Sequence, residues 1–437
     1  MVDAFSSMFT QDQVFLRTLQ VLFAIIPFFL IYRVTKALWG EWLGYIQGEF
    51  FEKEGAILLQ IRLPKDQTKT PAAMELMLTG LKQDGGESTW IDKYWKGKTR
   101  SWFSLEIVSL SGQVYFFIWT RPSVKAIIEA QVYAQYPSAE VVEAEDYMDD
   151  LDLSSGKYEL MGFEMGLTKP DPYPIKTYVE YGLDKAGEDE EYKVDPLTPL
   201  LEFMGGIQQD HNILIQILVR SHKAETRSFA DTVIWKPWTW FGKSVDSWKD
   251  DAIAEVKKIK ESVAPKKEDG TPDTSKPLSL TEGQKDTIKA LEASTGKYAF
   301  DIGMRTIYIA KKDIFEGSNI PGMVGGLKQF GSESHNGFKP VWKTKFDYPW
   351  EDVTGRRSEK RKEIIFDAYK ARGFFYRPWL LVGSGKLLPG GSYERKPFIL
   401  NTEELATIYH FPGQVAQTPT FGRLNSRKGE APSNLPI

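Results

Sequence analysis

Cysteine is missing from all 437 residues of the chain, and histidine occurs only four times. The first absence excludes disulfide bonds, thiolate zinc sites, iron–sulfur clusters and cysteine nucleophiles, and it favours a reducing compartment such as the cytoplasm. No histidine has a second metal-ligating residue type at a spacing such as H-E-x-x-H. The four are His211, His222, His335 and His410. The sequence therefore predicts no catalytic metal and no cofactor.

An excess of charge of one sign is also missing. The 55 basic and 59 acidic residues nearly cancel, to a net charge of -4. So small a net charge creates no global field that would attract nucleic acid or an anionic surface. Any contact with a polyanion must therefore come from a local patch, and the sequence leaves nucleic-acid binding open.

Motifs of nucleotide chemistry and acyl transfer are missing as well. Residues 382–387, VGSGKL, imitate a phosphate-binding loop, but Leu380 and Leu387 stand where that loop needs a glycine and a hydroxyl residue. We interpret Gly383 and Gly385 as part of a turn. No G-x-S-x-G motif occurs. These absences predict that the chain is not an enzyme.

Long apolar runs are scarce, but one lies near the N-terminus. Residues 21–32 are twelve apolar residues without a charge, and residues 14–39 together are long enough to span about 30 Å of hydrocarbon. We therefore expect a transmembrane helix over 14–39, with basic residues at the headgroups and an aromatic belt after them. The residues assigned to the membrane interface are Arg33, Lys36, Trp39, Trp42 and Tyr45.

A cleaved signal peptide and a buried core helix are the alternatives for this segment. A signal peptide carries positive charge before its apolar run and small residues after it. Residues 1–16 contain no Lys or Arg, and bulky Leu38 and Trp39 follow the run. Because positive charge follows the segment, the positive-inside rule predicts an inner-membrane protein with its N-terminus outside, its body in the cytoplasm and the lipid bilayer as a partner.

Apolar alternation predicts an α+β body after the anchor. Residues 50–150 follow the order strand, helix, strand, strand, helix, strand, which is typical of a ferredoxin-like unit. The same order recurs over 157–350, where we expect the first strand near 178–182. The sequence therefore predicts two ferredoxin-like domains in tandem, the second with a charged helical insertion at about 222–296.

Two clusters in the second half each permit two interpretations. Trp235, Trp238 and Trp240 form either a loop packed on its own domain or an exposed contact surface. The last predicted region, 351–437, opens with a basic helix that could grip phosphates or form a solvated face. Interleaved acids favour the solvated face. The basic residues are Arg356, Arg357, Lys360, Arg361, Lys362, Lys370 and Arg372, and the acids are Glu359, Glu363 and Asp367.

The C-terminal part carries a resemblance to a known family. Residues 398–413, FILNTEELATIYHFPG, the pair Thr418 and Pro419 and the terminal APSNLPI resemble the segment just ahead of the ATPase domain in bacterial conjugation and type IV secretion ATPases of the TraG/TraD-like group. Residues 58–66 and 130–147 resemble that group's front region. The chain stops where the family's nucleotide-binding domain would begin, and no Walker motif lies upstream.

The resemblance implies a membrane-anchored, non-ATPase subunit of a type IV secretion or conjugation apparatus, which tethers a separate ATPase motor, or else a truncated form of a longer protein. The residues expected to dock that partner are Asn401, Glu403, Glu404, His410, Phe411 and Pro412. One alternative is a structural membrane protein that forms homo-oligomers without a motor. Another is an enzyme whose unrecognised site gathers histidines with carboxylates.

Overall fold

A computed structural model describes residues 2–64, 69–83, 85–86, 89–153, 155–184, 194–223, 248–264, 280–376 and 396–413, to which all structural statements refer. By internal contacts the chain divides into two compact units. The first contains the long helix α1 (Val2–Glu54), up to Lys53, and the short helix α3 (Trp90–Tyr94). The second contains the sheet and the helices that pack on it.

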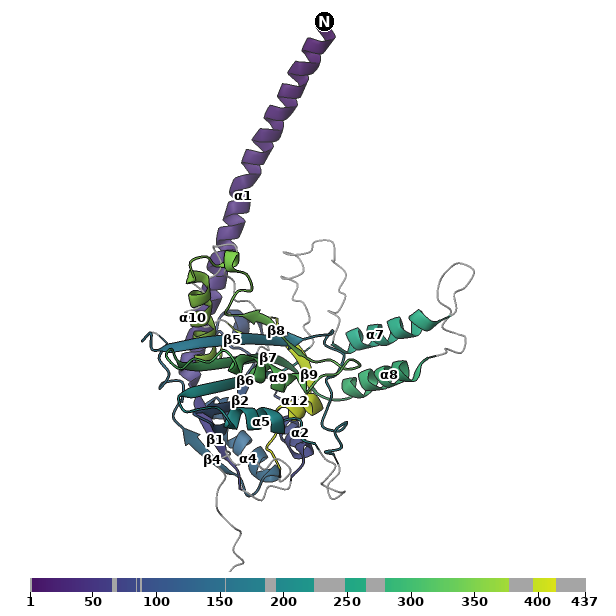
Figure 1. Ribbon diagram of the computed structural model, residues 1–437. Helices are drawn as coiled ribbons and strands as arrows, with labels where there is room; N and C mark the ends of the chain where they lie inside the picture. The colour runs from purple at the N-terminus through teal and green to yellow at the C-terminus, as the bar shows by residue number, and fades with distance from the viewer. Residues whose placement is uncertain are drawn as a thin grey trace, which may run out of the picture. The chain divides into compact units, whose positions relative to one another are not determined.

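The second unit is built on one nine-stranded antiparallel sheet (Figure 1). Its order is β4-β1-β3-β2-β6-β7-β5-β8, and β9 pairs with the start of β7. The strands are β1 (Ile57–Arg62), β2 (Trp102–Leu110), β3 (Gln113–Thr120), β4 (Glu140–Ala144), β5 (Tyr158–Leu167), β6 (His211–Ser221), β7 (Ala299–Lys311), β8 (Phe338–Lys343) and β9 (Phe398–Asn401).

The prediction of two tandem ferredoxin-like domains is wrong. β2 lies in the first predicted domain and β6 in the second, yet the two strands pair from Trp102↔Arg220 to Leu110↔Asn212. This ladder joins both halves into one sheet. Alternation within a strand identifies the face that is buried but not the neighbouring strand, so the β2–β6 pair left no local signal.

The strand predicted at 178–182 is also wrong. These residues form turns, and the backbone N–H of Tyr178 donates to Thr407 Oγ1 at 3.0 Å. The strand that occupies this place in the sheet is β5, which begins 20 residues earlier, at Tyr158. Its segment YELMGFEMGL contains two glycines and two glutamates, which weaken the apolar alternation expected of a strand.

Helices cover both faces of the sheet. One face carries α2 (Pro71–Gly80), α4 (Lys125–Gln135), α5 (Thr198–Gly205), α9 (Asn319–Lys328) and α12 (Thr402–Ile408), whose buried residues share one apolar core with the strands. The other carries α10 (Arg356–Lys370), which has its own smaller core. Two 3₁₀ turns are η1 (Pro122–Val124) and η3 (Pro349–Glu351).

The strand β7 shows why the sheet needs cover on both sides. Phe300, Ile302 and Met304 belong to the core under α12, whereas Ile307 and Ile309 belong to the core under α10. Successive side chains of a strand point to opposite faces. Both sets are apolar, so leaving either face in water would expose large apolar area.

The insertion between β6 and β7 contains the two helices α7 (Trp248–Val263) and α8 (Glu282–Thr295), in the region where the sequence predicts a charged helical insertion. A capping box starts α8: Thr281 accepts from the backbone N–H of Gln284, and the side chain of Gln284 accepts in return. The tryptophans predicted as a contact surface, Trp235, Trp238 and Trp240, lie outside the described residues.

The predicted transmembrane anchor is wrong. In the described part of the chain, every helix is either too short or too polar to cross a bilayer. The uncharged run at 21–32 rises only about 18 Å along a helix, against about 30 Å of hydrocarbon, and lengthening it brings in Arg17, Arg33 and Lys36. The inner-membrane localisation and the bilayer contact assigned to the interface residues lose their basis with it.

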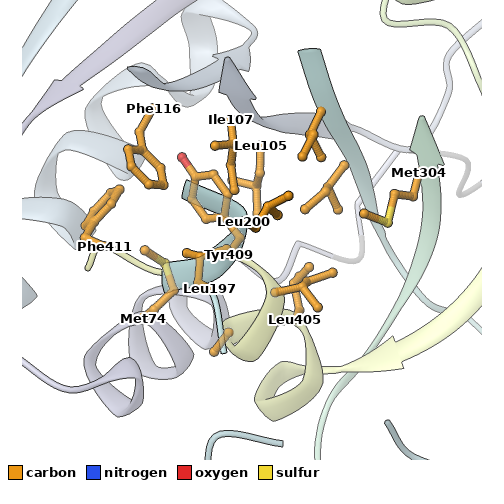
Figure 2. Close-up of a cluster of buried hydrophobic side chains, with 14 of the residues drawn as sticks. Met74, Leu105, Ile107, Phe116, Leu197, Leu200, Met304, Leu405, Tyr409 and Phe411 are labelled. Carbon is orange, nitrogen blue, oxygen red and sulfur yellow. The ribbon is translucent and has the colours of Figure 1, made fainter. Parts of the chain in front are cut away.

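The C-terminal helix α12 is part of the main core. Figure 2 shows Leu405, Tyr409 and Phe411 among side chains from α2 and the strands, such as Met74 and Phe116. The ring of Phe411 lies 5.6 Å from that of Phe116 and 4.9 Å from that of Tyr136.

We therefore expect Leu405→Ala to lower the free energy of unfolding by about 2–5 kcal/mol, since the fully buried side chain would leave a cavity between α12 and the sheet. Urea unfolding measures the change. Leu76→Ala, in the exposed face of α2, is the matched control and should change the free energy by less than about 0.5 kcal/mol. Equal losses in both variants would contradict the placement of α12 in the core.

Candidate binding groove at helix α10

Four polar residues form a line across the central strands on the face that α10 covers, and we call them the polar ladder. They are Glu106 in β2, Gln216 in β6, Arg305 in β7 and Glu164 in β5, and each is directly opposite the next in the strand register. All four are at most 1% exposed. Burying an unpaired charge costs free energy, so the hydrogen bonds within the polar ladder determine whether α10 can cover this face of the sheet.

The bonds of the polar ladder run from strand to strand. Gln216 Nε2 donates to Glu106 Oε1 at 3.1 Å, and Arg305 Nη1 donates to Gln216 Oε1 at 3.0 Å. Arg305 Nε donates to Glu164 Oε1 at 2.6 Å. Because the residues are cross-strand neighbours, strand pairing alone brings these side chains within hydrogen-bond distance of one another.

The polar ladder also holds the C-terminal end of α10. Arg305 Nη1 donates to the carbonyl oxygen of Ala368 at 2.9 Å, and Nη2 donates to that of Gly373. Gln216 Nε2 donates to the carbonyl oxygen of Tyr369 at 3.1 Å. The carbonyl oxygens of Ala368 and Tyr369 also accept the backbone N–H groups of Gly373 and Arg372, so Arg305 and Gln216 add side-chain donors to the turn that ends α10.

Arg372, just after α10, supplies the second buried cation. Its backbone is left-handed, with φ of 47°, and its guanidinium donates to both carboxylate oxygens of Glu106, at 3.1 and 3.2 Å. It also donates to Asp146. Burial alone would raise the pKa of Glu106, but the charge and hydrogen bonds of Arg372 outweigh it and hold that pKa below its usual value. Glu106 is therefore an ionised anchor for α10.

The outer side of α10 forms one wall of a groove of about 710 Å³, the α10 groove. That volume lies within the roughly 300–1,000 Å³ of ligand pockets. Six carboxylates and three ammonium groups line it, together with four apolar or aromatic side chains. The lining residues are Asp149, Asp152, Glu159, Glu359, Glu363, Asp367, Lys312, Lys362, Lys370, Leu151, Leu153, Tyr158, Phe366 and Gly156.

Charge pairing in the α10 groove is incomplete. Lys362 pairs with Glu159 and with Glu359, and Lys370 Nζ lies 2.9 Å from Asp149. Two further acids on α10, Glu363 and Asp367, follow Glu359 at helical spacing.

Glu363 and Asp367 are one helical turn apart and both are exposed. Among the described residues, neither makes an ion pair. Partial burial and the neighbouring Glu363 carboxylate raise the pKa of Asp367. Two like charges at this spacing destabilise a helix, and a cation between them would relieve the repulsion.

The basic residues that the sequence groups on α10 make separate contacts in the structure. Arg357 and Arg361 stack over the ring of Phe346, at 4.7 and 3.8 Å, and donate to backbone carbonyls. Lys362 pairs with acids, and Arg372 is buried. The interpretation as a helix face with interleaved acids is the one that these contacts favour.

The residues predicted to dock a partner lie mostly inside the second unit. Asn401 and Glu404 form the capping box that starts α12, and Glu404 Oε1 also accepts from the backbone N–H of Ile175 at 2.9 Å. The buried members of the set are Asn401, Glu404, His410, Phe411 and Pro412. Glu403 is half-buried and pairs with Lys297 at 2.5 Å. Docking through these residues stays a prediction, and their present contacts are within the chain.

The four histidines do not share a site. His211 contacts Tyr308, His222 contacts Asp301 and His335 contacts Glu180, each at a separate place. His410 Nε2 lies 3.2 Å from both carboxylate oxygens of Asp195. Within the described ranges, no group of three His, Asp or Glu residues is arranged to hold a metal ion.

The aromatic residues of the predicted belt are on the surface of the first unit. Trp39, Trp42 and Tyr45 are each about half exposed, and the ring of Trp39 lies 5.8 Å from that of Tyr94 in α3. Arg33 is exposed too, whereas the side chain of Lys36 is not among those the structure describes. The exposed aromatic side chains form a surface of the first unit alone.

Sequence reasoning missed the polar ladder, although a signal was present. Gln216 interrupts the apolar run from Ile213 to Val219 in β6, and Glu106 and Arg305 are charged residues inside the largely apolar strands β2 and β7. A charged residue in a strand buried on both sides needs a partner on a neighbouring strand. The pairing of the strands is what identifies that partner.

We expect Arg305→Met to lower the free energy of unfolding by about 3–5 kcal/mol, because Glu164 and two carbonyls of the α10 end would lose their buried cationic donor. Urea denaturation measures it. Arg62→Met is the control, since Arg62 forms an exposed pair with Glu140 at 3.7 Å and should cost less than about 1 kcal/mol. A change at Arg305 no larger than at Arg62 would refute the role of the polar ladder.

Stability should also fall as the pH rises from about 5 to about 8. Burial raises the pKa of Glu404 to about 8, from 4.5, so between these values the folded chain keeps a proton that the unfolded chain has released. The loss is at most about 1.4 kcal/mol per pH unit. His410 adds to it in the same direction: burial opposes its protonation, but Asp195 raises its pKa overall, so its stabilising charge is lost as pH rises through that value.

Urea unfolding across this pH range measures the slope. Glu404→Gln should flatten it, whereas Glu202→Gln, an exposed glutamate on α5, should leave it unchanged. An unaltered slope in Glu404→Gln would show that this carboxyl is ionised in the folded chain throughout the range.

Comparison with known proteins adds a family but no activity. A family model described as a domain of unknown function (DUF8128) matches residues 47–422, which include the polar ladder, the α10 groove and α12. No curated protein matches the chain.

Proposed function

Because the chain belongs to the DUF8128 family, whose description states no activity, we propose a function from the α10 groove: the protein is a non-enzymatic tether that binds a basic segment of a partner protein. The observation that carries this proposal is the excess of carboxylates in the α10 groove, six against three ammonium groups. Lysine or arginine side chains of a partner would restore the balance, with strong charge-assisted hydrogen bonds.

The apolar part of the α10 groove supports a peptide rather than a simple cation. Leu151, Leu153, Tyr158 and Phe366 line it beside the acids. The methylene stems of lysine and arginine pack on such side chains while their charged ends reach carboxylates. A segment that alternates basic and apolar residues would use both parts of the α10 groove.

The rigidity of α10 supports binding as well. Both buried arginines fix the end of the helix that carries Glu363 and Asp367, so the wall of the α10 groove is in place before a partner arrives. A site that is already ordered loses less conformational entropy on binding.

The resemblance to conjugation and type IV secretion proteins suggests which partner the tether holds. It implies a separate ATPase of the TraG/TraD-like class, and this partner stays a proposal. The tethering role does not require a membrane anchor, because the α10 groove belongs to the second unit alone.

We expect the double variant Glu363→Gln/Asp367→Asn to bind a labelled peptide of alternating lysine and leucine about 3- to 30-fold more weakly than the wild type, since two exposed charge contacts contribute up to about 1 kcal/mol each. Fluorescence anisotropy measures the dissociation constant. Added salt should reduce the difference, because it screens exposed charges.

The matched control is Glu282→Gln/Asp286→Asn, which removes two exposed acids at the same spacing from α8. It should bind the peptide like the wild type. Equal affinities for all three proteins would place binding outside the α10 groove. In cells, affinity capture should recover a Walker-motif ATPase with the wild type and the control but not with the α10 variant; if all three recover the same ATPase, the α10 groove does not hold it.

A further inference from the structure

One ammonium group of the α10 groove already pairs with an acid that a basic partner would use. Lys370 Nζ lies 2.9 Å from the carboxylate of Asp149, which belongs to the other main segment of the lining, residues 149–159. Lys370 also follows Asp367 by three residues, so the two side chains are neighbours on α10. Partial burial raises the pKa of Asp367, and the charge of Lys370 opposes that rise. Lys370 therefore acts on acids of both segments.

The pair between Lys370 and Asp149 is open to displacement. The two side chains are 46% and 69% exposed, and an ion pair in contact with water adds little stability. The hydrogen bond from Lys370 lowers the pKa of Asp149, so the carboxylate is ionised at neutral pH. Lys362 differs, because its side chain is only 13% exposed and pairs with both Glu159 and Glu359. An incoming cation would therefore displace Lys370 more readily than Lys362.

Contacts that do not involve Lys370 hold Asp149 in place. The backbone N–H of Asp149 donates to the carbonyl oxygen of Asp146 at 2.9 Å, and the carboxylate of Asp146 accepts from Arg372 at 3.0 Å. The buried Tyr147 between them in sequence donates to a carboxylate oxygen of the polar ladder at 2.7 Å. Asp149 therefore keeps its position when Lys370 moves away, and it can pair with another cation without the cost of ordering its backbone.

We propose that Lys370 is an internal competitor in the α10 groove: its ammonium group pairs with Asp149 in the free protein and is displaced by a basic residue of the bound segment, a role that rests on the function proposed above. A ligand with one cation gains little from this exchange, because one ion pair replaces another. A ligand with several cations also reaches Glu363 and Asp367, which make no ion pair among the described residues. The competitor thus favours segments with more than one basic residue.

Fluorescence anisotropy of the full chain with the labelled peptide of alternating lysine and leucine tests this proposal. Lys370→Met should lower the dissociation constant about 2- to 5-fold, because Asp149 loses its exposed partner and the peptide no longer meets the positive charge of Lys370. Lys370→Arg keeps the charge and should bind like the wild type. In an Asp149→Asn background, Lys370→Met should have a smaller effect, since the acid for which the ammonium group competes is gone.

The matched control is Lys125→Met, which removes the lysine of another exposed pair, with Glu143 at 2.8 Å, outside the α10 groove. It has the same net charge as Lys370→Met and should bind the peptide like the wild type. An unchanged or higher dissociation constant in Lys370→Met would overturn the proposal, and so would equal tightening in the control, which indicates a general effect of net charge. If neither the wild type nor Lys370→Met binds the peptide, the function proposed for the α10 groove falls, and the competitor with it.

Discussion

Arg305 holds a positive charge at the centre of the sheet, where it is fully buried, and the arrangement on that face depends on how the charge is satisfied. Its guanidinium reaches Glu164 on one neighbouring strand, Gln216 on the other and two carbonyls at the end of α10. A guanidinium has five donors in a planar fork, which suits this set of acceptors better than an ammonium group would. Arg305 therefore joins the sheet to α10, together with Gln216 and Arg372.

The contacts that hold the end of α10 also connect the core of the sheet to the α10 groove on the surface. The inner side of α10 contributes Ile365, Phe366 and Tyr369 to the smaller core, and its end is held by the polar ladder. Its outer side carries the acids of the α10 groove. Because a helix is a rigid rod over this length, the position of Glu363 and Asp367 follows from contacts made on the opposite side. A partner that binds there would meet a preformed wall, which is the property that a tether needs.

The other face of the sheet is also covered by helices, but there the contacts with the strands are mainly apolar. There, α12 inserts apolar side chains, and its polar groups are used to hold backbone: Glu404 accepts from Asn401 and Ile175, and Thr407 accepts from Tyr178. Residues that resemble a docking segment in sequence thus serve the fold of the chain itself. The resemblance in that segment is compatible with a structural role, because buried capping residues are constrained as strongly as a contact surface.

Local patterning along the chain was enough to predict several elements: the order of strands and helices over residues 50–150, a charged helical insertion, and the interleaved acids and bases of α10. Each of these depends on residues a few positions apart. The folded chain was needed to establish that β2 pairs with β6, that Arg305 lies opposite Gln216 and Glu164, and that Glu404 and His410 are buried rather than exposed. These facts depend on partners about 90 to 230 positions away in the chain. The pattern along a strand or helix reports which side is buried but not what lies against it.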